Sequence, residues 1–400
     1  MKPTRIGLFF LILLLGLGAR GAGPAGARRD VAREIQSIRS FTYYPFARNW
    51  QTFDLKTYEA SLDEMKKVGA NAVWLVLPWV DFQPQALPSP VWNEQAVRNL
   101  DRAVGLAEER GIKAILPLCY LGAGWSPQGI DARFWTLDPK TYAAFERYAL
   151  ELVRRLSAHG NMLLLLYTEG SEPALDALRD SPLAVASFKA WCRARNGDVA
   201  IWNKRWATQY TWDNLEPLLP KGASTDRWTD HWRWVADLMV KTHGELARKI
   251  KAQVGDKALL GYHEYSLINH DWAKGDSPIP KDNPYDFLSF VHYANFDQAP
   301  LDRTEENMRV KLERFRTRYP KMPLLLGESG ADSYHFGFKD QAAAAQRVLT
   351  FARDTRIGVN WWMWRDFVGA DLSQCSYGVC TPDGTPKPAC GVMRKIWLGK

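Results

Sequence analysis

Two glutamates, Glu172 and Glu328, stand where short apolar runs of the sequence end, and a pair of carboxyl groups can perform acid–base and nucleophilic chemistry. Glu172 follows Ser171 directly, and Glu328 follows Gly327. Retaining glycoside hydrolysis needs two carboxyl groups about 5–5.5 Å apart, one protonated to aid the leaving group and one ionised to attack the anomeric carbon. Such chemistry requires a fold that brings the ends of these two runs together.

Short apolar runs alternate with amphipathic helical stretches along most of the chain, which is the pattern of parallel βα units. Eight runs are predicted to be strands, at 41–44, 72–77, 114–119, 162–167, 258–262, 287–291, 323–327 and 359–362. Helical spacing of apolar residues predicts helices at 55–68, 94–110, 141–158, 304–319 and 339–355. We therefore expect an α/β fold, a (β/α)8 TIM barrel, whose active site forms at the carboxyl ends of the strands. A doubly wound open sheet is the alternative, but no glycine-rich nucleotide loop follows the first strand.

The fourth connection is predicted to carry a helical, Trp-rich insertion. Two helices are expected there, at 183–195 and 228–253, joined by a segment rich in tryptophan. The chain has 18 tryptophans, and aromatic faces stack on the apolar faces of sugars. Tryptophan also packs in protein cores, so this composition fits a glycan binder without requiring one.

The amino-terminal residues 1–23 resemble a secretory signal peptide. Lys2 and Arg5 precede an apolar run at 6–17, and small residues follow it. The apolar run is short for a membrane span, so we expect a cleaved signal with no stable membrane insertion afterwards. The remaining residues, 24–400, are predicted to form one catalytic domain of a secreted or periplasmic protein.

Composition restricts the other classes of partner. The formal charge is +8, but Lys and Arg are interspersed with acidic residues, which favours a basic surface over a nucleic-acid partner. The five cysteines show no zinc-site spacing, and neither a metal nor an organic cofactor is implied. Cys375, Cys380 and Cys390 lie close in sequence, which is compatible with one local disulfide. The oligomeric state is left open.

The placement of Glu172 and Glu328 resembles that in clan A glycoside hydrolases, which are TIM-barrel retaining β-glycosidases. In that clan the acid/base follows strand four in an Asn-Glu-Pro signature, and the nucleophile ends strand seven. The corresponding triplet here is Ser171-Glu172-Pro173, in which Ser171 replaces the Asn that contacts the sugar 2-hydroxyl. The resemblance implies that Glu172 is the acid/base and that Glu328 is the nucleophile.

Five further residues are candidates for substrate binding. The resemblance places Tyr293 where the clan has a Tyr that bonds the nucleophile, and Trp364 where it has the aromatic floor of the sugar site. His263 and His292, at the ends of strands five and six, could bind sugar hydroxyls or be satisfied structural histidines. Trp125, after strand three, could line a sugar subsite or simply pack in the core.

Two families within the clan are kept as alternatives. The aromatic residues between 188 and 212 are similar to the insertion of family 42 β-galactosidases, whereas His292 and Tyr293 lie near the strand-six His and Tyr of family 5 β-glycanases. The expected function is therefore hydrolysis of β-linked oligo- or polysaccharides by double displacement, with a carbohydrate substrate as partner. The rival interpretations are a non-catalytic carbohydrate-binding barrel, which the substitution at Ser171 favours, and an exported scaffold protein that binds a partner through the insertion.

Overall fold

The computed structural model describes residues 30–43, 50–119, 125–167, 181–217, 222–264, 279, 282–293 and 304–399. From Val31 onward the chain forms one compact unit. The expected signal peptide and the segment that holds Ser171 and Glu172 lie outside the described residues. Within those that are described, no helix is long and apolar enough to cross a membrane.

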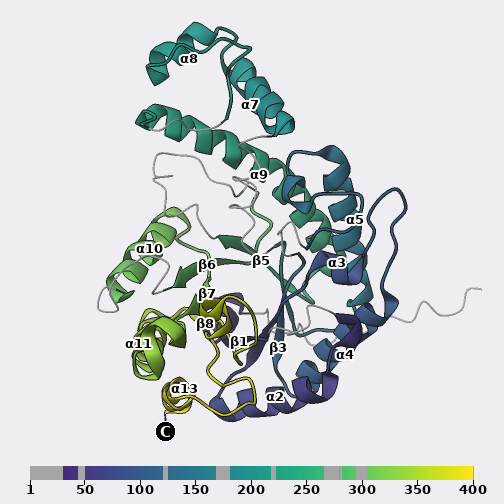
Figure 1. The fold of residues 1–400 in the computed structure, drawn as a ribbon, viewed down its shortest axis with the longest axis vertical. Coiled ribbons are helices and arrows are strands. Elements are labelled where there is room, and N and C mark those ends of the chain that lie inside the picture. The colour runs from purple at the N-terminus through teal and green to yellow at the C-terminus, as the bar shows by residue number, and fades with distance from the viewer. Residues whose placement is uncertain are drawn as a thin grey trace, which may run out of the picture. The chain divides into compact units, whose positions relative to one another are not determined.

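Eight parallel strands close into a barrel in which each strand pairs with its neighbours in chain order, and β1 pairs with β8 (Figure 1). The TIM barrel predicted from the sequence is thus confirmed, with every expected strand present. The strands are β1 (Arg39–Tyr43), β2 (Ala72–Leu75), β3 (Lys113–Pro117), β4 (Met162–Leu165), β5 (Leu259–Glu264), β6 (Phe287–Tyr293), β7 (Leu324–Gly330) and β8 (Gly358–Trp361).

Helices surround the strands, and every helix expected from helical spacing is present. Most observed helix ends lie within two residues of the predicted ones. They are α2 (Leu55–Val68), α4 (Glu94–Glu109), α5 (Pro139–Arg155), α7 (Pro182–Arg195), α9 (Thr225–Val254), α10 (Thr304–Arg318) and α11 (Ser333–Thr355). Several shorter elements were not predicted from the sequence. They are the helices α1 (Val31–Gln36), α3 (Trp79–Phe82), α8 (Val199–Trp206), α12 (Leu372–Cys375) and α13 (Pro388–Leu398), and the 3-10 turns η1 (Trp50–Thr52) and η3 (Ala132–Phe134).

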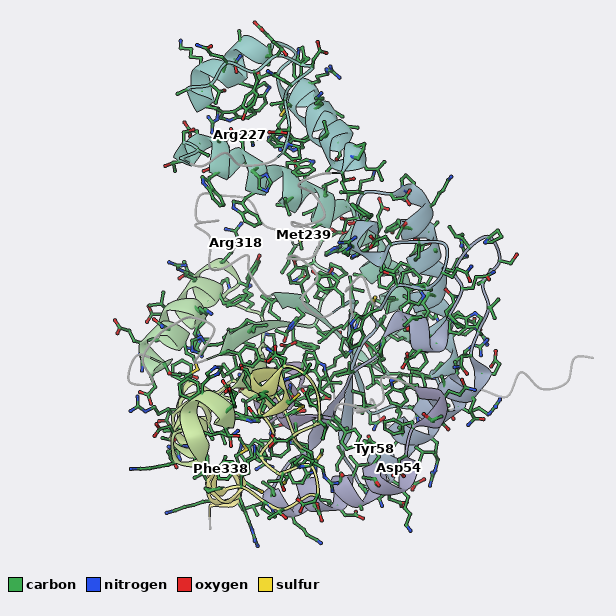
Figure 2. The ribbon with its side chains drawn as sticks, in the orientation of Figure 1. Asp54, Tyr58, Arg227, Met239, Arg318 and Phe338 are labelled. Atoms are coloured by element: carbon green, nitrogen blue, oxygen red, sulfur yellow. The ribbon has the colours of Figure 1, made fainter. Side chains whose placement is uncertain are left out.

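Local capping explains where α2 begins and ends. The carboxylate of Asp54 accepts hydrogen bonds from the backbone N–H groups of Lys56 and Thr57, which satisfies donors that have no partner within the helix. Gly69 then adopts a left-handed conformation, with φ of 102°, and ends the helix. Asp54 and Tyr58, one turn later, are labelled in Figure 2.

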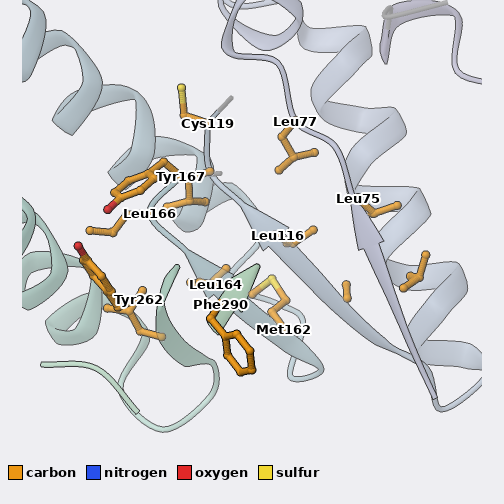
Figure 3. Close-up of a cluster of buried hydrophobic side chains, with 14 of the residues drawn as sticks. Leu75, Leu77, Leu116, Cys119, Met162, Leu164, Leu166, Tyr167, Tyr262 and Phe290 are labelled. Atoms are coloured by element: carbon orange, nitrogen blue, oxygen red, sulfur yellow. The ribbon is translucent and has the colours of Figure 1, made fainter. Parts of the chain in front are cut away.

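The strands separate two apolar layers because their side chains alternate between the barrel interior and the surrounding helices. The inner layer contains Trp74, Ile115, Leu163, Leu165, Phe287 and Leu325, all buried. The outer cluster, part of which is drawn in Figure 3, includes Leu75, Leu116, Leu164 and Phe290. Above the inner layer, the interior positions become polar toward the carboxyl ends of the strands.

The insertion after β4 packs around a buried arginine. Arg227 of α9 is fully buried, and its guanidinium lies 4.6 Å from the ring centroids of both Phe188 and Trp206. It donates a hydrogen bond to the carbonyl of Glu216 at 2.6 Å. Figure 2 shows Arg227 among the side chains of α7, α8 and α9. Many of the insertion's tryptophans are therefore core residues of a helical subdomain. This is the alternative to glycan binding that the sequence left open.

The five cysteines are free thiols, so the local disulfide that their spacing allowed is absent from this structure. All five are buried. The thiols of Cys380 and Cys390 share a hydrogen bond, which raises the pKa of Cys380 and lowers that of Cys390.

Candidate active site

A change of register in β7 turns Glu328 into the mouth of the barrel. Leu326 pairs with Phe290 of β6, but the next residue of β6, Val291, pairs with Glu328, so β7 has one extra residue at Gly327. Such a bulge interrupts the alternation of side chains along a strand. Leu326 faces the helices, and without the extra residue Glu328 would face them too. With it, the Glu328 side chain lies 2% exposed among interior residues of β5 and β6.

The bulge requires glycine because the space beside Gly327 is filled. A Cβ atom at this position would overlap Oγ of Ser289 and lie 3.2 Å from Cε1 of His263. Its carbonyl accepts a hydrogen bond from Asn360 Nδ2 at 2.8 Å, and the same nitrogen is 2.8 Å from Oγ1 of Thr42. The backbone beneath Glu328 is therefore held from β8 and β1 as well as from β6.

Both oxygens of the Glu328 carboxylate face polar side chains. The hydroxyl of Tyr293 donates a hydrogen bond to Oε2 at 3.1 Å, in the arrangement that the resemblance implied. Nε2 of His263 lies 3.6 Å from Oε1, and Nδ1 of the same ring is 2.8 Å from Oγ of Ser289. These contacts restrict the orientation of a buried carboxylate near the carboxyl end of β7, the end at which barrel active sites form.

One aromatic cluster adjoins this site, and it includes Trp362 instead of Trp364. Trp125 and Trp362 pack, partly exposed, against a buried group that contains Tyr293 and Tyr377. The backbone N–H of Trp362 donates to the carbonyl of Ser329 at 2.8 Å, next to Glu328. Tyr293 thus contacts Glu328 on one side and belongs to the cluster of Trp125 and Trp362 on the other.

Trp364 is placed elsewhere. Its indole is 2% exposed and belongs to the cluster between strands and helices, with its ring 5.0 Å from that of Phe41 in an edge contact. The spacing along β8 does not distinguish the two tryptophans. Asn360 faces the barrel interior, and strict alternation would put both Trp362 and Trp364 on its side, but β8 ends at Trp361 and only Trp362 lies with the interior cluster.

The two histidine candidates also separate. His263 faces Glu328, whereas His292 lies between Val291 and Tyr293, whose side chains point to the interior cluster. Alternation along β6 therefore puts His292, which is 1% exposed, on the opposite face of the strand from Tyr293. Ser289 and Asn360 were not singled out by sequence reasoning, because buried polar residues within apolar runs carry no motif.

An ion pair between the buried Lys387 and the half-buried Asp366 supports the loop after β8. Nζ of Lys387 lies 2.6 Å from Oδ2 of Asp366 and 2.9 Å from Oγ of Ser333. Burial raises the pKa of Asp366 and lowers that of Lys387, while the ion pair between them opposes both shifts. The pair ties the segment beyond Trp364 to the start of α11 and the start of α13.

Glu172, the second carboxyl group of the expected pair, lies outside the described residues, as do Ser171 and Glu169. The strand that precedes them in the sequence, β4, pairs with β5, which carries His263. Within the part of the chain that is described, no group of three His, Cys, Asp or Glu side chains could hold a metal ion.

Comparison of the sequence with protein-family profiles and with curated proteins finds no match. Solved structures do match. A GH5_18 protein from Streptomyces cattleya, in complex with Manβ1-4GlcNAc, aligns with a TM-score of 0.62 at 18% identity, over 90% of this chain and 80% of its own. A broad-specificity GH5-4 endoglucanase from Clostridium acetobutylicum aligns with a TM-score of 0.57 at 13% identity, over 92% and 98% of the two chains. The fold is similar to that of clan A glycoside hydrolases.

A third structure with a similar fold is a β-galactosidase. The β-galactosidase from the psychrophilic Marinomonas ef1 aligns with a TM-score of 0.65 at 14% identity, and covers 90% of this chain and 58% of its own. The resemblance to a clan A barrel is thus confirmed as a likeness of fold. The choice between family 5 and family 42 stays a prediction, because enzymes of more than one specificity match at similarly low identity.

Proposed function

We propose that this protein is a retaining β-glycosidase in which Glu328 is the nucleophile and Glu172 is the acid/base. One observation carries the proposal: the Glu328 carboxylate is buried at the mouth of a closed eight-stranded barrel, with Tyr293 on one oxygen and His263 on the other. A carboxylate held at the carboxyl end of a barrel strand is suited to attack an anomeric carbon above it. The clan A likeness of the fold agrees with this chemistry, although fold alone does not determine function.

The reaction proceeds by two displacements at the anomeric carbon. Glu172 gives its proton to the glycosidic oxygen while a carboxylate oxygen of Glu328 forms a bond to the anomeric carbon, and the aglycone leaves as an alcohol. Glu172, now ionised, then takes a proton from water as that water attacks the same carbon and Glu328 departs. The configuration is inverted twice, so the sugar is released with its original anomeric configuration.

We propose that the substrate is a β-linked hexoside. We expect it to be found among β-mannosides, β-galactosides and β-glucosides. The structural neighbours support this range, since one binds Manβ1-4GlcNAc, one is a β-galactosidase and one is an endoglucanase. Trp362 and Trp125, which flank Tyr293, would stack on the apolar face of such a sugar.

Turnover of 4-nitrophenyl β-D-mannoside, β-D-galactoside and β-D-glucoside tests the proposal, with Glu328→Gln as the inactive variant. Glu306→Gln, an exposed position on α10, is the matched control and should retain full activity. Proton NMR during early turnover should show the β-anomer first. Initial release of the α-anomer would contradict the nucleophile assignment. Binding of these sugars without any turnover would instead favour the non-catalytic carbohydrate-binding barrel.

We also infer that the chain is exported and that its first 23 residues are removed. The charged start, the apolar run and the small residues that follow it support this inference. Mass spectrometry of the protein produced in a host with a secretory pathway should find a new amino terminus close to residue 24. A full-length chain retained in the cytoplasm would contradict it.

A further inference from the structure

We propose that Ser289 and His263 form a positioning relay for the nucleophile, in which Ser289 sets the orientation and tautomer of His263 and His263 holds Oε1 of Glu328. The inference rests on the proposed function, because it assigns Glu328 as the group to be held. It joins three neighbouring strands: His263 lies on β5, Ser289 on β6 and Glu328 on β7.

The imidazole of His263 is locked in place by its surroundings. Its side chain has no exposed surface, and its ring meets the indole of Trp74 edge-on, with 5.4 Å between the ring centroids. Gly327 lies beside the ring, where a Cβ atom would come within 3.2 Å of both Cε1 and Nδ1. A ring packed on these sides cannot turn away from Glu328 without disturbing the barrel interior.

The partners of the two ring nitrogens favour one tautomer. A neutral imidazole carries one N–H donor and one acceptor nitrogen, and the bond made by one nitrogen decides the role of the other. An acceptor Nε2 would direct its lone pair at the ionised Glu328 carboxylate 3.6 Å away, which is repulsive. When the hydroxyl of Ser289 donates to Nδ1, Nε2 carries the hydrogen and points it at the carboxylate instead.

The relay complements the bond from Tyr293. Tyr293 donates a hydrogen bond to Oε2, and His263 faces Oε1. Together they fix the plane of the carboxylate as well as its position. The separation of 3.6 Å between Nε2 and Oε1 is longer than a hydrogen bond. Contacts of this kind tighten when substrate binds, and we expect Nε2–H to close on Oε1 as the other oxygen approaches the anomeric carbon.

Histidine nitrogen NMR tests the relay without any substrate. In protein labelled with ¹⁵N-histidine at about pH 8, the His263 signals, assigned by their loss in His263→Gln, should report a neutral ring with its hydrogen on Nε2. Ser289→Ala should weaken that preference and shift Nδ1, whereas Ser40→Ala should not. Ser40 is the matched control, since it is a fully buried serine of β1. A hydrogen on Nδ1, or an imidazolium ring, in the wild-type protein would overturn the relay.

Covalent trapping of Glu328 tests whether the relay speeds attack by this carboxylate. The 2,4-dinitrophenyl 2-deoxy-2-fluoro-β-D-glycosides of mannose, galactose and glucose need little acid assistance, so their inactivation rate reports attack by Glu328 itself. Ser289→Ala should lower the limiting rate constant about tenfold, with the inhibitor dissociation constant changed less than about threefold. Ser289→Cys, which keeps a weak donor, should give an intermediate rate, and Ser40→Ala should label at the wild-type rate.

The outcomes separate the relay from the proposed function. If none of the three reagents labels Glu328 in the wild-type protein, the proposed function fails, while the NMR result still decides the tautomer. If the wild-type protein is labelled and folded Ser289→Ala reacts equally fast, the relay is overturned and the nucleophile assignment stands. Should Ser289→Ala not fold, Ser289→Cys carries the same test, and an unchanged rate in that variant with an unchanged His263 tautomer counts against the relay.

Discussion

The hydroxyl of Tyr293, the last residue of β6, donates a hydrogen bond at 3.1 Å to Oε2 of Glu328 on the adjacent strand β7. Hydrogen bonds to a charged group contribute about 1.5–3 kcal/mol, and a buried carboxylate that loses such a donor is both less oriented and less well solvated. Tyr293→Phe should therefore lower kcat/KM about tenfold to a hundredfold on the best aryl glycoside. Circular dichroism should show an unchanged fold. A folded Tyr293→Phe protein with normal kcat/KM would mean that this bond serves stability alone.

The identity of the acid can be tested by the quality of the leaving group. Glu172→Ala should cripple cleavage of natural glycosides but spare formation of the glycosyl-enzyme from dinitrophenyl glycosides, whose departure needs little protonation. Added azide should then speed breakdown of the intermediate and yield a β-glycosyl azide. Glu169→Ala is the matched control, three residues away. If it shows this behaviour and Glu172→Ala does not, Glu169 is the acid.

The two tryptophans beyond β8 should respond differently to truncation. Trp362→Ala should lower kcat/KM by at least about tenfold with little change in Tm, because the partly exposed indole lies with Trp125 at the site. Trp364→Ala should chiefly reduce stability, by about 3–5 kcal/mol, because it empties a buried position against Phe41. Denaturant unfolding and steady-state kinetics on both variants distinguish the roles. The reverse pattern would restore Trp364 as the floor of the sugar site.

The bulge glycine should not tolerate a side chain. In Gly327→Ala the new methyl group would overlap Oγ of Ser289, so the barrel must shift and Tm should fall. Combining it with Ser289→Ala removes the overlapping atom and should recover part of the lost stability. A double variant no more stable than Gly327→Ala alone would place the damage in the backbone instead.

His243 should make the protein sensitive to acid. Its ring is fully buried, stacks on Trp135 with 4.5 Å between centroids, and has the hydroxyl of Tyr167 at 3.2 Å from Nδ1. Burial lowers the pKa of His243 from 6.5 to about 3. Below pH 6.5 the unfolded chain therefore binds a proton that the folded protein excludes, and stability should fall as the pH drops from 6.5 toward 3.

Thermal unfolding between pH 4 and pH 8 measures this effect, with His243→Gln as the comparison. The variant should be less stable than wild type at pH 8, because packing is lost, but its Tm should fall less steeply with acidification. Parallel Tm profiles for the two proteins would show that other groups control the acid sensitivity.

The barrel could be predicted from the sequence because its strands are apolar on both faces and its helices have a regular apolar stripe. Leu163 and Leu164 illustrate this, since one packs inside the barrel and the other against the helices. Local spacing of this kind carries strand and helix identity, but short helices such as α13 depend on tertiary packing and leave a weaker signal.

The site was predictable only in part, for physical reasons that differ between residues. Glu328 and Tyr293 were found because each lies just beyond a predicted strand, and the structure places them in contact. Strict alternation along β7 would have turned Glu328 toward the helices, and the bulge that prevents this arises from contacts of Gly327 with β5 and β6 that lie far away in sequence. Trp362 was overlooked in favour of Trp364 because the path of the chain beyond β8 departs from an extended strand.

The position of α13 has a consequence for how the chain is made. This helix packs between α11 and α2, and the carbonyl of Trp397 near its end accepts a hydrogen bond from Arg39 at the start of β1. On the ribosome, β1 emerges early, but its partner β8 and the helix that packs beside both emerge only after the six strands between them. The growing chain must therefore carry an open, aggregation-prone strand edge while those strands are made, and the barrel can close only once β8 has emerged.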